Sequence, residues 1–557
     1  MIGMRSEKVF QGPLRVGHRA LARCVGFTES DFGKPVVAIV NSWNEIVPGH
    51  VHLRELANFV KIGIREKGGV PLEFNTIAIC DGIAMGHEGM RTSLPSRDVI
   101  ADSIELMVKA HGFDAMVCIG TCDKIIPGML LAAARLDLPT VFVLGGGMLP
   151  FCPSYGHFKG RKMTAVDIAE VFEKLQRGII ENEYAKFVEE NICTTYGACA
   201  GMFTANTMQC LTEALGLTLP LMATTPAVYS AKIRLALESG RLVMDVLKND
   251  ITPSQILTEE AFENAIIVDM ALGGSTNTVL HLPAIANEAG IRLSLDKFDE
   301  ISRKVPNLCS IAPNGQHTIF DLHMAGGVPA LLKRLEKFIN KDCLTVMNRK
   351  IREIIEVARI YDDEVIRPLT NPFRREGGIA ILHGNLAPKG AVVKTSAMNE
   401  KMMKFRGLAR VFDCEESAVS AILSREINEG DAIVIRYEGP KGGPGMREML
   451  TATTLLMLSG FENVALITDG RFSGATRGPC VGHVSPEAAD KGPIAAVKDG
   501  DEVEIDIPSR KLDVLLDEDE IENRLSKIRE FEPRVKKGCL YRYSKLVSSA
   551  DEGAILK

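Results

Sequence analysis

The sequence predicts an α/β fold: an N-terminal α/β domain with a parallel sheet, followed by a C-terminal β-rich domain that is β-barrel-like. The chain has 557 residues, too many for one ordinary hydrophobic core. From about residue 35 to 300, short apolar runs alternate with helical patterns, as in parallel sheets whose strands are joined by helices. After a linker around 366–378, the runs become short, β-like and punctuated by glycine. We therefore expect one domain over 1–370 and another over 371–557.

Four apolar runs predict buried parallel strands in the first domain: PVVAIVNS, FNTIAIC, FDAMVCIG and PTVFVLGG. Between the second and third runs, SRDVIADSIELMVKAH predicts a helix with Ser96 as its N-cap and with Ile100, Ile104 and Val108 on one face. Pro127 suits the first turn of the following helix. In the second domain, strands are predicted at GGIAILHG, GAVVKTS, DAIVIRYEG, VALITDG and DEVEIDIPSRKLDVLL.

Composition excludes several functional classes. The net charge of −6 and the pI near 6.1 give no basic surface for nucleic acid. The N-terminus lacks the apolar core of a signal peptide, and the longest apolar stretch is interrupted by Arg135 and Asp137, so no membrane span is expected. Thirteen cysteines, an odd number, favour a reducing, cytoplasmic setting with thiols that are core residues, metal ligands or catalytic groups. Cys118, inside a predicted strand, is expected in the core.

Unusual side chains follow two of the predicted strands. FNTIAIC leads into Cys80 and Asp81, and FDAMVCIG leads into Cys122, Asp123 and Lys124. Ligands of open parallel sheets bind beyond the carboxyl ends of the strands, so the two loops could face each other there. Carboxylates suit a hard cation such as Mg²⁺, and a thiol suits iron in a cluster. An Asp-Gly turn and an Asp–Lys ion pair are the structural alternatives, and a lysine ammonium would repel a metal ion.

A third cysteine-bearing loop is NICTTYGACAGMFTANTMQCL, with Cys193, Cys199 and Cys210. Its spacing is not that of a zinc knuckle, which makes a structural zinc site a weak prediction. Small residues around Cys199 leave room for a cluster or a ligand near the backbone. Cys210 falls on a predicted helix among apolar residues and is expected in the core.

Two loops of the second domain also carry polar groups. RYEGPKGGPGMREML is predicted to open a helix, with Glu448 in its first turn. Its glycines would let the backbone approach an anion, although a simple tight loop explains them as well. NVALITDGRFSGATRG presents Asp469, Arg471 and Ser473 after another strand. Ser473 lacks the context of a hydrolase nucleophile, and GGGML at 145–149 lacks the full dinucleotide-binding pattern.

Together these segments resemble the dihydroxy-acid dehydratase family, within the larger group that includes the sugar-acid dehydratases. The resemblance covers nearly the whole chain and rests on eight segments in order: DFGKPVVAIVNSWNEIVPGHVHL, CDGIAMGHEGM with the following SLPSR, TCDKIIPGM, CAGMFTANTM, GGSTNTVLHL, RYEGPKGGPGMREML, LITDGRFSG and GHVSPEAA. It implies dehydration of a 2,3-dihydroxy carboxylate to a 2-keto acid, as in valine and isoleucine synthesis. It also implies a homodimer or a dimer of dimers.

The resemblance further implies the roles of individual residues. Cys122 and Cys199 would bind an iron–sulfur cluster, and Ser473 would be the catalytic base. Mg²⁺ would be held by four residues of the family motifs, one of them a carboxylated lysine: Asp81, Asp123, Lys124 and Glu448. A carbamate is an anionic oxygen ligand, which removes the objection that a lysine ammonium repels a metal. In this mechanism Mg²⁺ acidifies the C2 proton of the substrate, and the cluster acts as a Lewis acid on the C3 hydroxyl.

One position departs from the family pattern. Many members have a cysteine where this chain has Gly49, in NEIVPGH, and glycine cannot bind iron. The alternatives for a third thiolate are Cys80 and Cys193, and a [4Fe–4S] cluster is favoured over a [2Fe–2S] cluster. His50 is expected to be a structural histidine.

Two other functions were weighed. A sugar-acid dehydratase acting on gluconate, its 6-phosphate or a pentonate is the nearest, but MREML after GGPG resembles the branched-chain enzymes more closely. A non-catalytic iron–sulfur sensor is disfavoured because the sequence offers no DNA-binding module or basic face as an output.

Overall fold

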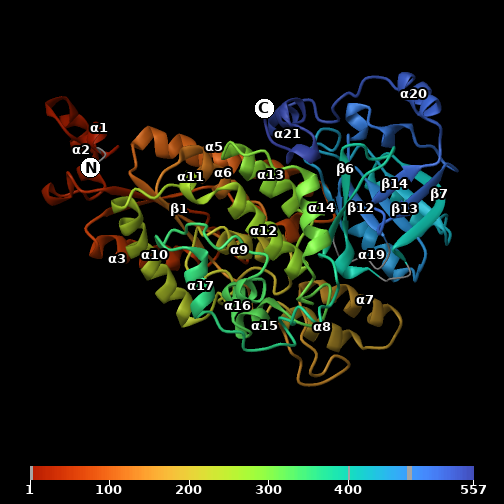
Figure 1. Cartoon of the computed structure of the whole chain (residues 1–557), viewed down its shortest axis with the longest axis horizontal. Coiled ribbons are helices and arrows are strands. Elements are labelled where there is room, and N and C mark those ends of the chain that lie inside the picture. The colour runs from red at the N-terminus through yellow and green to blue at the C-terminus, as the bar shows by residue number, and fades with distance from the viewer. Residues whose placement is uncertain (1–3, 399–401, 473–478) are drawn as a thin grey trace.

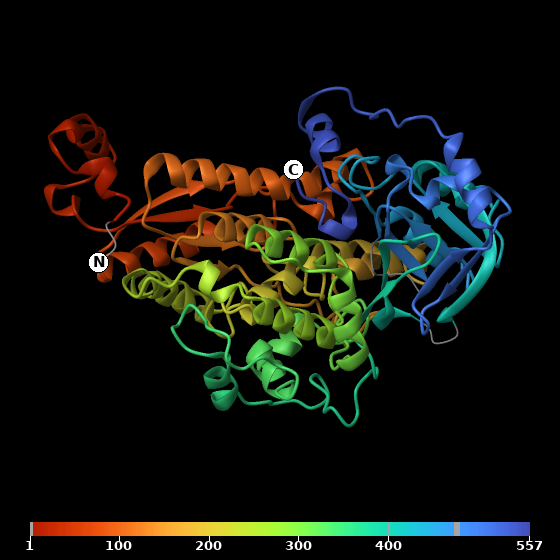
Figure 2. The ribbon, with the colours of Figure 1, turned by 45° about the horizontal axis from the view of Figure 1, so that its top comes forward.

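The computed structural model describes residues 4–398, 402–472 and 479–557 of the chain. It contains a parallel sheet in the first half and a mixed, barrel-like sheet in the second, which confirms the predicted fold class (Figure 1). A short arm with helices α1 (Glu7–Phe10) and α2 (Val16–Cys24) projects from the first half, at the end away from the second half (Figures 1 and 2). No helix in these described ranges is both long and apolar enough to cross a membrane.

The first sheet has four parallel strands in the order β2-β1-β3-β4. Their bounds are β1 Val36–Asn41, β2 Val70–Asn75, β3 Ala115–Gly120 and β4 Thr140–Leu144. Helix α3 (Leu53–Glu66) joins β1 to β2, and α5 (Ser93–His111) leads from β2 to β3. These connections run in opposite directions across the sheet, and because such crossovers are right-handed they place their helices on opposite faces.

Helices make up most of the remaining first half and bury one large apolar core with the sheet. They are α4 (Asp81–Ala84), α6 (Ile125–Leu136), α7 (Ile168–Gln176), α8 (Asn182–Asn191), α9 (Thr204–Ala214), α10 (Ser230–Lys248), α11 (Pro253–Ile256), α12 (Glu259–Leu272), α13 (Thr278–Glu288), α14 (Leu295–Lys304), α15 (Ile319–Met324), α16 (Gly327–Arg334) and α17 (Ile351–Val357). Cys118 and Cys210 lie in this core, as the sequence predicted.

The second sheet has eight strands in the order β14-β13-β7-β8-β10-β12-β6-β5. Their bounds are β5 Ile379–Leu382, β6 Gly390–Lys394, β7 Lys404–Phe412, β8 Asp431–Ile435, β10 Ala465–Thr468, β12 Cys480–Ser485, β13 Glu502–Asp506 and β14 Lys511–Val514. The two edges of the sheet meet, because His383 after β5 donates to Arg510 and accepts from Leu512, each over 2.9 Å. This contact nearly closes the barrel around its own apolar core.

Four helices accompany the second sheet: α18 (Glu415–Leu423), α19 (Thr451–Leu458), α20 (Glu518–Ser526) and α21 (Gly538–Leu546). Helices α18 and α19 pack against its outer face through a second apolar cluster. Helix α21 and the C-terminus return to the boundary between the two halves (Figure 1). There the buried Arg97 of α5 donates to the carbonyls of Gly553 and Ala554, which joins the C-terminal segment to the first half.

Three predictions about local structure are wrong. The second strand is Val70–Asn75, and most of FNTIAIC is the loop that follows it, since Asn75 is the last residue paired with β1. Helix α5 begins at Ser93 with Thr92 as its N-cap, so Ser96 lies inside the helix. Glu448 lies in a two-residue strand, β9 (Glu448–Met449), which pairs with β11 (Arg471–Phe472) before α19 begins. Strand pairing outweighs the local helix signal at this position.

Candidate active site

The topology places a crevice at the carboxyl ends of β1 and β3. From β1 the chain moves to β2 on one side of β1 and then to β3 on the other side. Strands β1 and β3 therefore border the switch point, which is where ligands of open α/β sheets bind. Gly49 and His50 lie in the loop after β1, and Cys122, Asp123 and Lys124 follow β3. The observed strand order therefore brings the predicted site residues to the ligand-binding edge.

A buried lysine amine lies between two carboxylates at this edge. Lys124 is fully buried, and its Nζ donates to Asp81 Oδ2 over 2.7 Å and lies 3.6 Å from Asp123 Oδ2. The Ser93 hydroxyl donates to the other oxygen of Asp81, Oδ1, over 2.7 Å. The ammonium occupies a position between carboxylates that also suits a metal cation. The loop that carries Asp81 and the loop that carries Lys124 are thus in direct contact, as the sequence predicted.

Glu448 approaches the same carboxylates from the second half. Its Oε2 accepts from Arg471 Nη1 over 2.9 Å and from Asn277 Nδ2, at the start of α13, over 3.0 Å. Asn277 belongs to the first half of the chain and Arg471 to the second, so this carboxylate is fixed by both. We call Asp81, Asp123, Lys124 and Glu448 the carboxylate pocket.

The electrostatics of the pocket show an excess of acid groups. Burial raises the pKa of Asp81, but the positive charges of Lys124 and Arg471 outweigh it and hold that pKa below its usual value. For Asp123, burial again raises the pKa, and the negative charges of Asp81 and Glu448 add to the rise. The two carboxyl groups shift in opposite directions because one amine does not compensate all the acids gathered here.

Four cysteines, which we call the cysteine group, border this pocket: Cys80, Cys122, Cys193 and Cys199. Burial raises the pKa of Cys122 well above its usual value, and the negative charges of Asp123, Cys80 and Cys199 add to the rise. Burial likewise raises the pKa of Cys199 to about 12. Cys80 is among the groups that raise the pKa of both of these thiols, and Cys193 is among those that raise the pKa of Cys199. Unliganded, these thiols are neutral at pH 7, and a bound metal would have to displace their protons.

Position 49 lies directly against the cysteine group. A Cβ atom at Gly49 would come within 2.7 Å of the Cys122 sulfur, so only a glycine fits this close to the thiol as the chain stands. The neighbouring His50 uses both ring nitrogens: Nδ1 donates to the Ser42 carbonyl over 2.8 Å, and Nε2 accepts from the Cys122 amide over 3.2 Å. Because Nδ1 carries the proton and Nε2 is occupied, His50 is a structural histidine that supports the backbone of Cys122.

We tested whether these residues fit the metal groups that the sequence suggested. Within the described ranges, no group of three or more His, Cys, Asp or Glu side chains is placed to hold a metal ion as it stands. In the carboxylate pocket the reason is visible, since the Lys124 ammonium already lies among the acids. The donors there are oxygen atoms, which suits Mg²⁺ once the lysine becomes anionic. Next to it are thiols, which suit an iron–sulfur cluster, and Gly49 brings the backbone close to one of them, the Cys122 sulfur.

The remaining residues that the sequence analysis singled out are not seen, within the described ranges, in contact with the carboxylate pocket. Ser473 lies outside the described residues, immediately after β11. Asp469 is structural, because its carboxylate accepts the backbone amides of Tyr437, Glu438 and Ala488 over 2.9–3.0 Å. The glycine loop does bind an acidic group, but one that belongs to the chain itself. The amides of Lys441 and Gly442 donate to the buried carboxylate of Glu487, over 2.8 and 2.7 Å.

Sequence reasoning missed two residues that orient the pocket, Ser93 and Asn277, and left Arg471 without a role. Each lies inside a segment that carried the family resemblance: SLPSR, GGSTNTVLHL and LITDGRFSG. The sequence therefore did contain a signal for these three residues, because each is a polar residue within a family motif. Their roles depend on contacts across distant parts of the chain, which spacing does not reveal.

Comparison with known proteins agrees with this arrangement. Two family models match, "Dihydroxy-acid/6-phosphogluconate dehydratase N-terminal" over residues 34–354 and the corresponding C-terminal model over 364–554. The chain is 54% identical to a dihydroxy-acid dehydratase of Pyrococcus abyssi and 55% identical to one of Caldicellulosiruptor saccharolyticus. It is 54% identical to a dihydroxy-acid dehydratase of Methanococcus maripaludis. Each comparison covers 100% of both chains.

Proposed function

The chain belongs to the dihydroxy-acid/6-phosphogluconate dehydratase family, and on this basis we propose that it dehydrates 2,3-dihydroxy carboxylates to 2-keto acids. The relatives place it among the hydro-lyases. The substrates proposed are 2,3-dihydroxyisovalerate and 2,3-dihydroxy-3-methylvalerate, which would place the reaction in valine and isoleucine synthesis.

The observation that carries the proposal is the buried Lys124 amine between Asp81 and Asp123, next to Cys122. Burying an ammonium among acids, two residues after a half-buried thiol, has a desolvation cost, and titratable groups in such surroundings are typical of functional sites. Carboxylation of the amine would convert it into a further oxygen ligand. The acids and the carbamate would then hold Mg²⁺ together.

We propose a separate set of protein ligands for Mg²⁺ and for the iron–sulfur cluster. Asp81, Asp123, carboxylated Lys124 and Glu448 would hold Mg²⁺, and Cys122 and Cys199 would hold the iron–sulfur cluster. When bound, Mg²⁺ supplies positive charge that acidifies the proton at C2, and the cluster supplies a Lewis acid for the C3 hydroxyl. The reaction removes water without a net change in oxidation state.

The chain's own residues perform three tasks in this proposal. Ser93 and Lys124 fix Asp81, while Asn277 and Arg471 fix Glu448, so the acids are held in place before substrate binds. Ser473, which follows β11 in the sequence and lies outside the described residues, would accept the C2 proton as the catalytic base. Burial of the pocket excludes bulk water and strengthens its electrostatic interactions.

For a third thiolate we favour Cys80 over Cys193, because Cys80 directly precedes Asp81 of the carboxylate pocket, whereas Cys193 is exposed. A cluster with three protein thiolates and one open iron, the [4Fe–4S] type, would use Cys80 in place of the missing ligand at Gly49. A [2Fe–2S] cluster is the alternative.

The test is turnover of 2,3-dihydroxyisovalerate by anaerobically purified protein of known iron, sulfide and magnesium content. We expect 2-keto acid formation that requires Mg²⁺, and faster turnover of this substrate than of gluconate or 6-phosphogluconate. A strong preference for a sugar acid would contradict the proposed substrate. Ser473→Ala should abolish turnover at normal metal and cluster content, and appreciable residual activity would refute the role of Ser473.

A further inference from the structure

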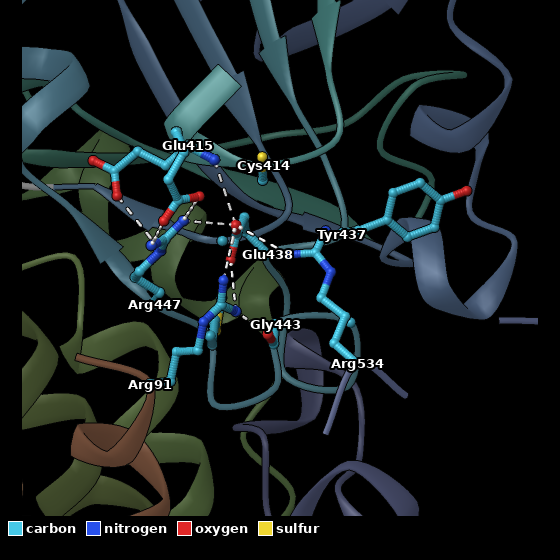
Figure 3. Close-up of polar contacts among 12 residues, drawn as sticks. Arg91, Cys414, Glu415, Tyr437, Glu438, Gly443, Arg447 and Arg534 are labelled. Atoms are coloured by element: carbon cyan, nitrogen blue, oxygen red, sulfur yellow. Dashed lines mark hydrogen bonds and ion pairs between the residues drawn. The ribbon is translucent and has the colours of Figure 1, made fainter. Parts of the chain in front are cut away.

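A buried glutamate at the boundary of the two halves gathers three arginines. Glu438, just after β8, is fully buried, and Figure 3 shows the guanidinium groups converging on it. Arg447 Nη2 lies 2.8 Å from Oε1, Arg91 Nη1 lies 3.1 Å from Oε2, and Arg534 Nη1 lies 3.4 Å from Oε1. We call Glu438 with these three arginines the clasp.

The three arginines come from different parts of the chain. Arg91 belongs to the first half, in a helical turn at Glu88–Thr92, and it also donates to the carbonyl of Gly443 in the glycine loop. Arg447 and Arg534 both belong to the second half, and Arg534 lies between α20 and α21. Arg91 is therefore the member of the clasp that joins the two halves.

The charges of the clasp are balanced by two further acids. Arg447 Nη1 donates to Glu416 Oε1 over 2.6 Å, and Arg447 Nε lies 3.4 Å from Glu415 Oε2. Three arginines thus meet three glutamates in a largely buried network. Removing one partner from such a network is costly, since it leaves another charge uncompensated, and the groups therefore keep a fixed geometry.

Short stretches of backbone connect the clasp to the carboxylate pocket. Arg91 lies two residues before Ser93, whose hydroxyl is bonded to Asp81. On the other side, Arg447 directly precedes Glu448. Glu438 consequently lies between the two chain segments that carry Asp81 and Glu448, the acids that come from opposite halves.

We propose that the Arg91–Glu438 pair is a positioning device that sets the separation of Asp81 and Glu448 and so tunes the affinity of the pocket for Mg²⁺. The inference rests on the proposed function of that pocket. It assigns Arg91 a role through other residues, without contact to substrate or metal. Residues that orient metal ligands typically change metal affinity by roughly 10–100-fold when they are replaced.

Two matched variants test it. Arg91→Gln removes the pair between the halves, whereas Arg534→Gln removes an equal charge from the same glutamate within the second half. Magnesium binding to the full-length, cluster-loaded protein is measured by calorimetric titration in bicarbonate buffer. We expect Arg91→Gln to weaken Mg²⁺ binding by roughly tenfold or more, and Arg534→Gln to change it by less than about twofold. Iron content serves as the measure of an intact first half.

The outcomes separate the possibilities. Wild-type Mg²⁺ affinity in Arg91→Gln, or an equal loss in both variants, would overturn the inference. If Arg91→Gln does not fold, Arg91→Lys keeps the charge but not the two-pronged geometry of guanidinium, and it should weaken Mg²⁺ binding measurably. Unchanged affinity in Arg91→Lys would then count against the pair. A wild-type chain that binds no Mg²⁺ would instead contradict the proposed function itself.

Discussion

The carboxylate pocket and the cysteine group meet at Cys122–Lys124 but are organised in different ways. The acids are held by hydrogen bonds from specific partners. Ser93 and Lys124 donate to Asp81, and Asn277 and Arg471 donate to Glu448. The pKa values of the Cys122 and Cys199 thiols are raised by burial, and Gly49 brings the backbone against the Cys122 sulfur. The acids are thus fixed in the metal-free chain, although the proposed Mg²⁺ site also requires carboxylation of Lys124, whereas the proposed cluster site requires its thiols to lose their protons.

This difference predicts two sites that fail separately. A pocket prepared by hydrogen bonds should keep its shape when the cluster is lost. A thiol site whose ligands must lose protons should depend on the metal for its final geometry. The variants below are arranged to break one site while leaving the other intact.

The largest effect is expected for Lys124→Met. The substitution removes the buried cation and the proposed carbamate, so Asp81 and Asp123 lose their nearest positive charge. We expect turnover to fall roughly 10³-fold, as when one preorganised electrostatic group is lost, and Mg²⁺ binding to disappear. Iron and sulfide content should stay near the wild-type value, measured by chemical analysis after anaerobic purification. Loss of both metals together would show that the two sites are not independent.

Cys122→Ser should produce the opposite result. A serine hydroxyl is a poor ligand for a cluster iron, so iron content and turnover should collapse. Calorimetric Mg²⁺ affinity should remain within a few-fold of wild type, because the acids keep their partners. Cys210→Ser is the matched control, a buried thiol of the core outside the cysteine group, and it should retain its iron. Equal loss of iron in both variants would mean that folding, not ligation, had been tested.

A smaller effect should distinguish the two candidates for a third thiolate. Cys80→Ala is expected to lower iron content and to alter the electron paramagnetic resonance signal of the reduced cluster. Cys193→Ala, which removes an exposed thiol, should leave that signal unchanged. The reverse pattern would assign the ligand to Cys193.

The smallest effect concerns Glu487, a buried acid held by backbone amides rather than by cations. Burial raises its pKa from 4.5 to about 8. In this range the folded chain holds a proton that the unfolded chain has released, so stability should fall as the pH rises from about 5 to 8 and level off above. The slope from this one group is at most about 1.4 kcal/mol per pH unit. Thermal unfolding of Glu487→Gln should show a shallower dependence on pH than wild type, and an unchanged dependence would contradict the assignment.

Much of this arrangement followed from the sequence, for physical reasons. Buried parallel strands are recognisable in the sequence as apolar runs. Charged residues or thiols directly after such a run stand out, and this pattern identified Cys122, Asp123 and Lys124. Glu448 was found by resemblance, but its strand was read as a helix start because pairing with β11 depends on residues far along the chain. Asn277 and the Arg91–Glu438 pair were missed for the same reason. They act across 171 and 347 positions of sequence, where local patterns carry no information.

In the proposed function, the junction of the two sites depends most on one chemical event, carboxylation of the Lys124 amine. It can be observed directly by ¹³C nuclear magnetic resonance of protein equilibrated with ¹³C-labelled bicarbonate and Mg²⁺, with Lys124→Met as the reference. We predict a carbamate signal in the wild-type chain that is absent from the variant and weakens when Mg²⁺ is removed. A wild-type spectrum without that signal, from protein that turns over substrate, would contradict the proposed role of Lys124 as a metal ligand.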